Sequence, residues 1–472
     1  MRWTSRIRTP DRAGRRASQQ SLTPEDRDRN REERRRRRIE RTRLVARVPG
    51  KAARGVARAP VVAVRGPARA LRDIRRYWQA EGRTMWQGYV GLWISSAGDL
   101  LAGLALAFMT HRLQYLPSLF ILVPAAIGMR GNIFGAMGSR LGTSIHAGTF
   151  RITREPQGVI YQNAYAALLL SVTTSAYLAV AARIISTATG LPSISVWDFL
   201  VISILAGAVS GIIILALTIA LTRVAYAREW DLDSVAGPVV TFLGDVVTLP
   251  SLFAASYLAR AHGVTLGVGI AVAILAVVAL VEALRTDLPM ARRILRESFI
   301  ILAIAGFIDL IAGTVVEHRI DHFLTLPALL ILIPPFLEDA GALGSIVAAR
   351  LASKLHLGAI RPSAIPERLA LLDISLLAPW ALSVFTLVGI SAHLISRATG
   401  HASPGLASMI VISLVAGYLA TIGAAIISYA TAVATFRFGL DPDTHGIPVL
   451  TSSMDLIGMI CLVGTIIVLH VR

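Results

Sequence analysis

The stretch Gly237-Pro-Val-Val-Thr-Phe-Leu-Gly-Asp-Val-Val-Thr-Leu-Pro250 places one carboxylate, Asp245, near the middle of a long apolar run. A helix needs about 20 such residues to cross a bilayer. A carboxylate at mid-depth costs roughly 2.5–3.5 kcal/mol on insertion scales, so such residues usually face a cavity, a partner or an ion. We therefore predict that Asp245 lies inside a membrane protein, at a functional position.

The same pattern recurs 210 residues later, in Gly446-Ile-Pro-Val-Leu-Thr-Ser-Ser-Met-Asp455. Residues four apart share a helix face, so Thr241 and Thr451 each place a hydroxyl one turn from an aspartate. Two such aspartates in a duplicated unit indicate the two sides of one cation site. The alternative is that protonated aspartates join helices by hydrogen bonds alone.

Duplication extends over most of the chain. A shift of 210 residues aligns 85–262 with 295–472 without a gap, and Leu116–Pro124 matches Leu326–Pro334 at six of nine positions. Each unit contains five apolar segments, and residues 263–294 add a connecting transmembrane helix and a cytoplasmic loop. The connecting span gives both units the same orientation, related by an axis along the membrane normal.

Composition sets the protein class. Only 16% of the 472 residues are charged and 54% are hydrophobic, whereas soluble chains average about 25% charged. We predict an all-α polytopic membrane protein with about 11 transmembrane helices, arranged as two parallel five-helix repeats and one connecting helix. The predicted spans lie near residues 86–109, 117–148, 160–186, 197–222, 236–259, 264–284, 297–317, 327–358, 368–396, 405–435 and 446–470.

The positive charge is concentrated in the first 80 residues. They carry 25 Lys or Arg and 8 Asp or Glu, a net charge of +17 out of +18 for the chain. We expect a disordered cytoplasmic arm drawn to anionic lipid, at about 1 kcal/mol per basic residue. Nucleic-acid binding is the alternative, and we do not expect it. The arginine-rich loops predict a cytoplasmic N-terminus and an outside C-terminus, in the plasma membrane.

Three further polar residues lie within predicted spans. Asp99 and Asp309 match each other in the two units and have either a supporting role near the ion or a structural one. Asn132 offers an amide oxygen, but the second unit has Ala342 in its place. Mg²⁺ keeps several waters and binds through one or two carboxylates, a demand that these oxygen groups suit.

Acidic pairs precede both aspartate-bearing helices on the predicted cytoplasmic side. They are Asp231 and Asp233 in the first unit, and Asp441 and Asp443 in the second. They either gather cations at the inner mouth or cap the helix N-termini, where negative charge complements the helix dipole.

The second spans differ in charge. Arg130 lies inside the first unit's span, and the second unit has Glu338 and Asp339 one or two residues before the matching position. We predict that Arg130 forms an ion pair with one of these acids across the axis, within about 4 Å. The alternative is that Arg130 extends to an interface while the acids face a water-filled vestibule.

Several of these motifs resemble a known family. Val123-Pro-Ala-Ala-Ile-Gly-Met-Arg-Gly-Asn132 and Gly138-Ser-Arg-Leu-Gly-Thr-Ser144 resemble the second-helix signature of solute carrier family 41. The stretches Asp233–Asp245 and Asp441–Asp455 resemble the last-helix signature of MgtE-type magnesium transporters. The resemblance covers roughly 85–472 and implies two fused MgtE-like membrane domains.

The resemblance also implies a role for the matched aspartates. In that family the last-helix aspartate coordinates the permeating divalent cation, a role that falls here on Asp245 and Asp455. The sequence departs from the family in two ways: the basic arm stands where MgtE has cytoplasmic sensor domains, and Pro335-Phe-Leu-Glu-Asp-Ala-Gly-Ala342 lacks the Gly-Asn of the signature.

We therefore expect a transporter of divalent cations rather than an enzyme, with Mg²⁺ as the transported ion and both repeats working within a monomer. One alternative is a Na⁺- or H⁺-coupled carrier in which Asp99 and Asp309 bind the coupling ion. The other is a membrane anchor that acts through its basic arm.

Overall fold

The structure is a computed structural model that describes residues 67–153, 155–228, 232–260 and 263–470, without the side chains of 67–71, 232–238 and 443. The chain divides into two compact units, residues 1–69 and 70–472. Nearly all of the first unit, and with it most of the predicted basic arm, lies outside the described residues.

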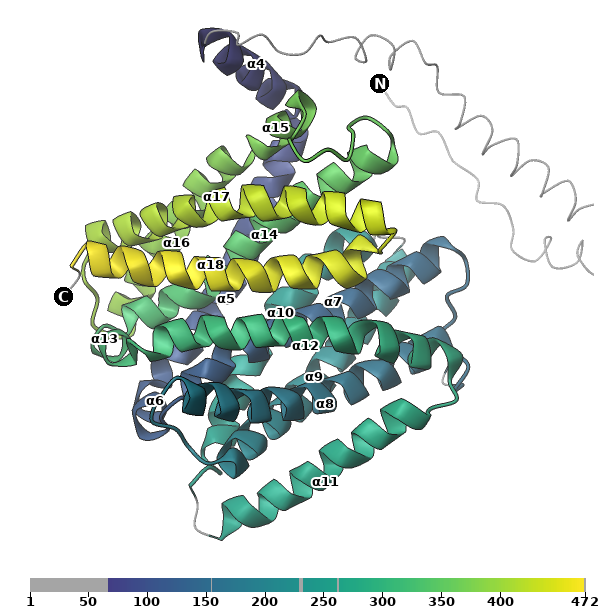
Figure 1. Ribbon diagram of the computed structural model, residues 1–472, viewed down its shortest axis with the longest axis vertical. Coiled ribbons are helices and arrows are strands. Elements are labelled where there is room, and N and C mark those ends of the chain that lie inside the picture. Colours follow the sequence, from purple (N-terminus) through teal and green to yellow (C-terminus); the bar gives the residue numbers. More distant parts are fainter. Residues whose placement is uncertain (1–66, 154, 229–231, 261–262, 471–472) are drawn as a thin grey trace, which may run out of the picture. The chain divides into compact units, whose positions relative to one another are not determined.

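Every regular element in the described ranges is a helix, and eleven helices are long and apolar enough to cross a membrane (Figure 1). The predicted fold class and number of spans are confirmed. The helices are α4 (Pro67–Ala80), α5 (Gly82–Phe108), α6 (Thr110–Tyr115), η1 (Leu119–Ile121), α7 (Leu122–His146), α8 (Val159–Ala188), α9 (Val196–Arg228), α10 (Leu232–Ser256), α11 (Val264–Arg285), α12 (Pro289–Glu317), α13 (Ile320–Thr325), α14 (Ala328–His356), α15 (Arg368–Ile374), α16 (Leu377–Ala398), α17 (Leu406–Phe438), η2 (Pro442–Gly446) and α18 (Ile447–Val468).

Helix boundaries recur at the 210-residue spacing. Adding 210 to the first and last residue numbers of α6 gives those of α13, and the same shift converts α9 into α17. Other elements are divided differently in the two halves, and α8 is an example, because its counterpart is divided into α15 and α16. Pro379 lies just after this break and has no N–H to donate to the carbonyl of Ser375, which interrupts the helical hydrogen bonds there.

The first half of the bundle, α5 to α10, and the second half, α12 to α18, contact each other through their first two long helices. The first helix of each half packs against the second helix of the other, α5 on α14 and α12 on α7. A Cβ on Gly103 would lie 2.2 Å from the carbonyl oxygen of Ile331, and one on Gly313 would lie 2.6 Å from that of Ile121. These contacts match at 210 residues, and only glycine permits so close an approach of two backbones.

These contacts between the halves determine which spans are the most buried. The second helices, α7 and α14, are the most buried of the spans, and α11 is the least. Helix α11 packs on α8 and α9 at one edge of the bundle, whereas α12 and α18 run side by side within it (Figure 1). The interior between the halves is therefore formed by α7 and α14 with their neighbours.

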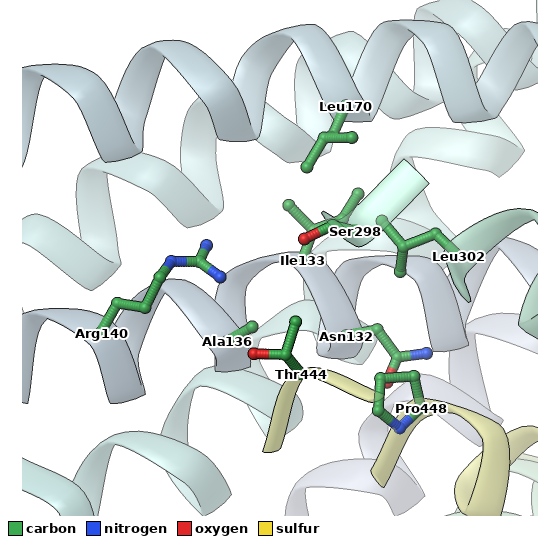
Figure 2. Close-up of a pocket in the computed structure, with 9 residues that line it drawn as sticks. All are labelled: Asn132, Ile133, Ala136, Arg140, Leu170, Ser298, Leu302, Thr444 and Pro448. Carbon is green, nitrogen blue, oxygen red and sulfur yellow. The ribbon is translucent and has the colours of Figure 1, made fainter. Parts of the chain in front are cut away.

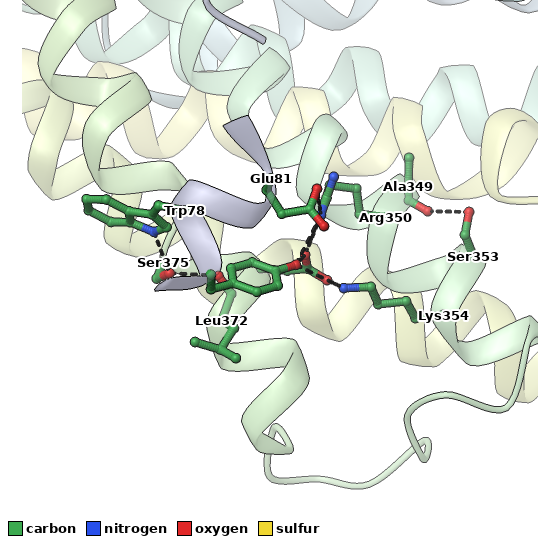
Figure 3. Close-up of polar contacts among 10 residues, drawn as sticks. Trp78, Glu81, Ala349, Arg350, Ser353, Lys354, Leu372 and Ser375 are labelled. Carbon is green, nitrogen blue, oxygen red and sulfur yellow. Dashed lines mark hydrogen bonds and ion pairs between the residues drawn. The ribbon is translucent and has the colours of Figure 1, made fainter. Parts of the chain in front are cut away.

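The end of α4 is attached to the second half by a cluster of polar contacts (Figure 3). Tyr77 Oη donates to Asp373 Oδ1 at 2.5 Å, and Trp78 Nε1 donates to Ser375 Oγ at 3.0 Å. Asp373 also forms ion pairs with Arg350 at 2.8 Å and Lys354 at 2.5 Å. Burial, together with the bond to Asp373, raises the pKa of the Tyr77 hydroxyl, which therefore stays protonated at neutral pH.

We predict that Gly313→Ala destabilises the protein, because its methyl group would meet the backbone of Ile121. Overpacking of this kind costs roughly 1–3 kcal/mol. Gly464→Ala is the matched control, since a Cβ there meets nothing within 4 Å. Thermal unfolding in detergent should show a lower midpoint for Gly313→Ala alone. Equal midpoints for the two variants would contradict the close approach of α12 and α7.

Candidate cation site

Six acidic side chains gather where the two halves meet. They are Asp99 on α5, Asp245 on α10, Asp309 on α12, Glu338 and Asp339 on α14, and Asp455 on α18. Asp245 interacts electrostatically with Asp99, Glu338 and Asp455. Asp455 interacts in turn with Asp309 and Glu338. The structure thus brings together all four aspartates that the sequence places at mid-depth in the membrane.

Within this group the carboxyl groups form two close pairs, Asp245 with Glu338 and Asp309 with Asp455. Asp245 and Asp309 are 0% exposed, and their oxygens lack a described donor in good hydrogen-bond geometry, although the Ser452 hydroxyl lies beside Asp309. Ionised carboxylates only accept hydrogen bonds. Each pair therefore needs a proton or a cation to be stable at this depth.

A cavity between α7 and α14 reaches one acid of each pair. Its walls are three residues of α7 and the three residues that match them on α14, and the polar groups in its lining are Glu338 and Asp455. The wall residues are Val123, Pro124 and Ile127 with Ile333, Pro334 and Leu337. Each wall residue of α7 therefore has its counterpart, 210 positions away, in the opposite wall. We call it the central cavity.

The two pairs differ because the halves differ at one position. A Cβ on Gly128 of α7 would lie 2.9 Å from Asp309 Oδ2 and 3.8 Å from Asp455 Oδ2. The residue that matches Gly128 on α14 is Glu338, which lies beside Asp245. The first half therefore leaves room beside a carboxylate pair, and the second half supplies an acid. Sequence reasoning did not assign Glu338 to the carboxylate group, although its alignment with Gly128 was the available signal.

Serine hydroxyls support the remaining acids. Ser96 Oγ lies 2.9 and 2.7 Å from the two oxygens of Asp339, and Ser95 Oγ donates to Asp99 Oδ2 at 3.3 Å. Both serines belong to α5. Asp339 is therefore held by the opposite half, whereas Asp99 is held by its own helix.

Arg130 does not form the predicted ion pair. Its Nη2 donates to Ser175 Oγ at 2.8 Å, and its other two guanidinium nitrogens have no hydrogen-bond partner among the described residues. The cause is helical geometry: residues two apart point about 200° apart around a helix. Gly128 faces the acids, so the side chain of Arg130 points into the first half. There, Arg130 Nη2 lies 2.9 Å from the position that a Cβ would take on Gly207.

The predicted threonines have a packing role in the structure. The Cγ2 atoms of Thr241 and Thr451 lie 3.5 and 3.6 Å from the positions that a Cβ would take on Gly131 and Gly341. Thr451 Oγ1 also donates to the carbonyl of Pro448 at 3.1 Å. Each threonine thus packs against the second helix of its own half.

Two of the other predicted residues, Asn132 and Asp441, have described surroundings. Asn132 borders a second cavity, and its Nδ2 is buried without a hydrogen-bond partner. Asp441 precedes η2 and interacts electrostatically with Arg140 and Arg293. Of the other mouth acids, Asp231 lies outside the described residues, as do the side chains of Asp233 and Asp443.

The described residues contain no group of three or more His, Cys, Asp or Glu that could hold a metal ion. Paired carboxylates still fit a hydrated hard cation, since Mg²⁺ retains waters and uses one or two carboxylates from its protein.

Comparison with known proteins places the chain among cation transporters. The model of the MgtE family, described as "Divalent cation transporter", matches residues 123–255 and 333–465. The two matched segments are 210 residues apart, and they contain Asp245, Glu338 and Asp455.

Curated relatives are distant but extend over most of the chain. Solute carrier family 41 member 3 of Mus musculus is 24% identical over 77% of this chain and 78% of its own length. Solute carrier family 41 member 2 of Mus musculus is 25% identical over 77% of this chain and 67% of its own length. No solved structure matches the chain.

We predict that Gly128→Ala weakens divalent-cation binding roughly tenfold, because its methyl group would displace the Asp309 carboxylate at a cost of about 1.4 kcal/mol. Gly135→Ala on the same helix is the control, since its Cβ would meet nothing within 4 Å. A bound cation raises the unfolding temperature with its concentration. The Mg²⁺ concentration that gives half of this rise should increase for Gly128→Ala alone, and an unchanged value would argue against a site beside Gly128.

Proposed function

This chain belongs to the MgtE family of divalent cation transporters, and we propose that it carries Mg²⁺ through a path between its two halves. The observation that supports this proposal most directly is the pairing of Asp245 with Glu338 and of Asp309 with Asp455. The oxygens of Asp245 and Asp309 are enclosed and lack a described donor in good hydrogen-bond geometry. A divalent cation neutralises such a pair without requiring a proton.

The two-fold plan of the path follows from the duplication. We propose that residues 85–262 and 295–472 are two MgtE-like units with the same orientation, joined by residues 263–294. One chain then supplies both sides of the path and functions as a monomer. The proposal places the protein in the plasma membrane with its N-terminus in the cytoplasm, where residues 1–80 meet anionic lipid. The relatives' name, solute carrier, is in keeping with transport.

The central cavity supports a stepwise route. Glu338 and Asp455 border it, while Asp245 and Asp309 lie behind them without exposure. An incoming cation meets one acid of a pair first and the enclosed acid second. The apolar walls strengthen both interactions, because charges attract more strongly where water is excluded.

A second candidate function rests on the presence of two pairs. If one pair holds Na⁺ or H⁺ while the other holds the cargo, the protein is a coupled carrier. The two pairs are chemically unequal, since Gly128 stands beside one and Glu338 belongs to the other. The two candidates differ in whether divalent flux requires a Na⁺ or proton gradient.

We predict that Asp245→Asn or Asp455→Asn lowers Mg²⁺ flux into proteoliposomes at least roughly tenfold, the effect of a barrier raised by about 1.4 kcal/mol. An amide keeps the shape of the side chain but removes its charge. Asp321→Asn, on the exposed surface of α13, is the control and should transport normally. A Mg²⁺-sensitive dye inside the vesicles measures the rate.

Wild-type rates in the Asp245→Asn/Asp455→Asn double variant would rule out the carboxylate path. Competition by Mn²⁺, Co²⁺ and Ca²⁺ in the same vesicles ranks the ions. Divalent flux that persists with Na⁺ absent and causes no pH change inside the vesicles would exclude the coupled carrier.

A further inference from the structure

A second cavity lies beyond the central cavity along α7. The central cavity borders α7 at residues 123–127, and the second borders it from Asn132 to Arg140 (Figure 2). Its other walls come from α8, α12, η2 and α18. They include Leu170, Ser298 and Thr444, with Ile133, Ala136, Leu302 and Pro448 completing the lining. We call this the side cavity.

The side cavity is aligned with the Asp309–Asp455 pair. On α12, Leu302 precedes Asp309 by seven residues, and on α18, Pro448 precedes Asp455 by seven. Seven residues are nearly two helical turns, so each cavity residue lies on the same face as the acid beyond it. On α7, Asn132 is one turn from Gly128, which faces both acids. The three helices that carry this pair and its glycine also line the cavity.

Polar groups mark the side cavity. Asn132 Nδ2 is buried without a partner, and Thr444 Oγ1 donates to Asp441 Oδ2 at 3.2 Å. Arg140 contributes the positive charge in the lining, and it interacts electrostatically with Asp441 and Glu297. Its Nε donates to Asn163 Oδ1 at 2.8 Å. Arg140 thus interacts with two acids, and the neutral polar groups of the lining are the amide of Asn132 and the hydroxyls of Ser298 and Thr444.

The matching position in the other half is occupied by an indole ring. Leu170 corresponds to Trp380, which is 0% exposed. The Trp380 ring lies 2.6 Å from where a Cβ on Gly88 would stand, and Gly88 corresponds to Ser298. Trp380 Nε1 donates to the carbonyl of Met85 at 3.1 Å, which fixes the ring there. The larger side chain therefore fills the position that Leu170 leaves open.

We propose that the cation path opens on the side where α7 ends through the side cavity, and that Trp380 blocks the matching position among the described residues of the other half. This inference rests on the proposed transport function. The difference between Leu170 and Trp380 then leaves the path open beside the Asp309–Asp455 pair and blocks it beside Asp99 and Asp245, the matching acids of the other half.

Exchange of these two side chains tests the route. Leu170→Trp should lower Mg²⁺ flux at least roughly tenfold, because an indole then fills the side cavity. Trp380→Leu should transport at least as fast as the wild type. The double variant Leu170→Trp/Trp380→Leu moves the opening to the other half and should recover most of the flux. Wild-type flux in Leu170→Trp would overturn the proposal, as would a double variant no faster than Leu170→Trp.

Thiol labelling tests the same route without transport. In a Cys461→Ser background, Ser298→Cys should react with a charged, membrane-impermeant thiol reagent, and Leu170→Trp should slow that reaction at least roughly tenfold. Ser353→Cys, at an exposed position near the end of α14, is the control for folding and should react equally in both backgrounds. Equal labelling of Ser298→Cys with and without Leu170→Trp would overturn the proposal.

The two experiments separate the route from the function. If the unmodified protein carries no divalent cation, the proposed function fails, whatever the labelling shows. If it carries Mg²⁺ and Leu170→Trp changes neither flux nor labelling, only the single opening fails.

Discussion

The cost of holding unpaired carboxylates in the middle of a membrane protein governs this structure. Asp245 and Asp309 are fully enclosed, and the ionisable groups that act on each of them are other acids. Two neighbouring negative charges in such surroundings repel strongly. A fold that tolerates this arrangement must supply each pair with a proton or a cation, and the central cavity between α7 and α14 borders one acid of each pair.

The depth of the acids and the number of spans could be read from the sequence, because both depend on the local run of apolar residues. The repeat could be read as well, and it placed Asp99, Asp245, Asp309 and Asp455 in equivalent pairs. Which residues meet across the halves depends instead on how each helix is rotated. Arg130 and Gly128 are two residues apart, and only packing determines that Gly128 faces the acids.

Duplication supplied two equal sets of helices, and substitutions at a few positions made their surroundings unequal. Glu338 stands where the first half has Gly128, and Trp380 stands where it has Leu170. The first change adds a charge to one carboxylate pair, and the second fills one of two matching spaces beside α7 and α14. Such differences are visible in an alignment of the halves, but their meaning requires the contacts of each side chain.

The contacts between the halves also constrain how the protein is made. Helix α7 ends at His146, but the α12 helix that covers it begins at Pro289, well over a hundred residues later. The first half therefore enters the bilayer with a seam around Gly128 that its own helices do not cover. Until synthesis reaches α12, that seam must be shielded by lipid or by the insertion machinery. A ribosome that stalls between the halves leaves a nascent chain with an uncovered helix face, which is a target for quality control.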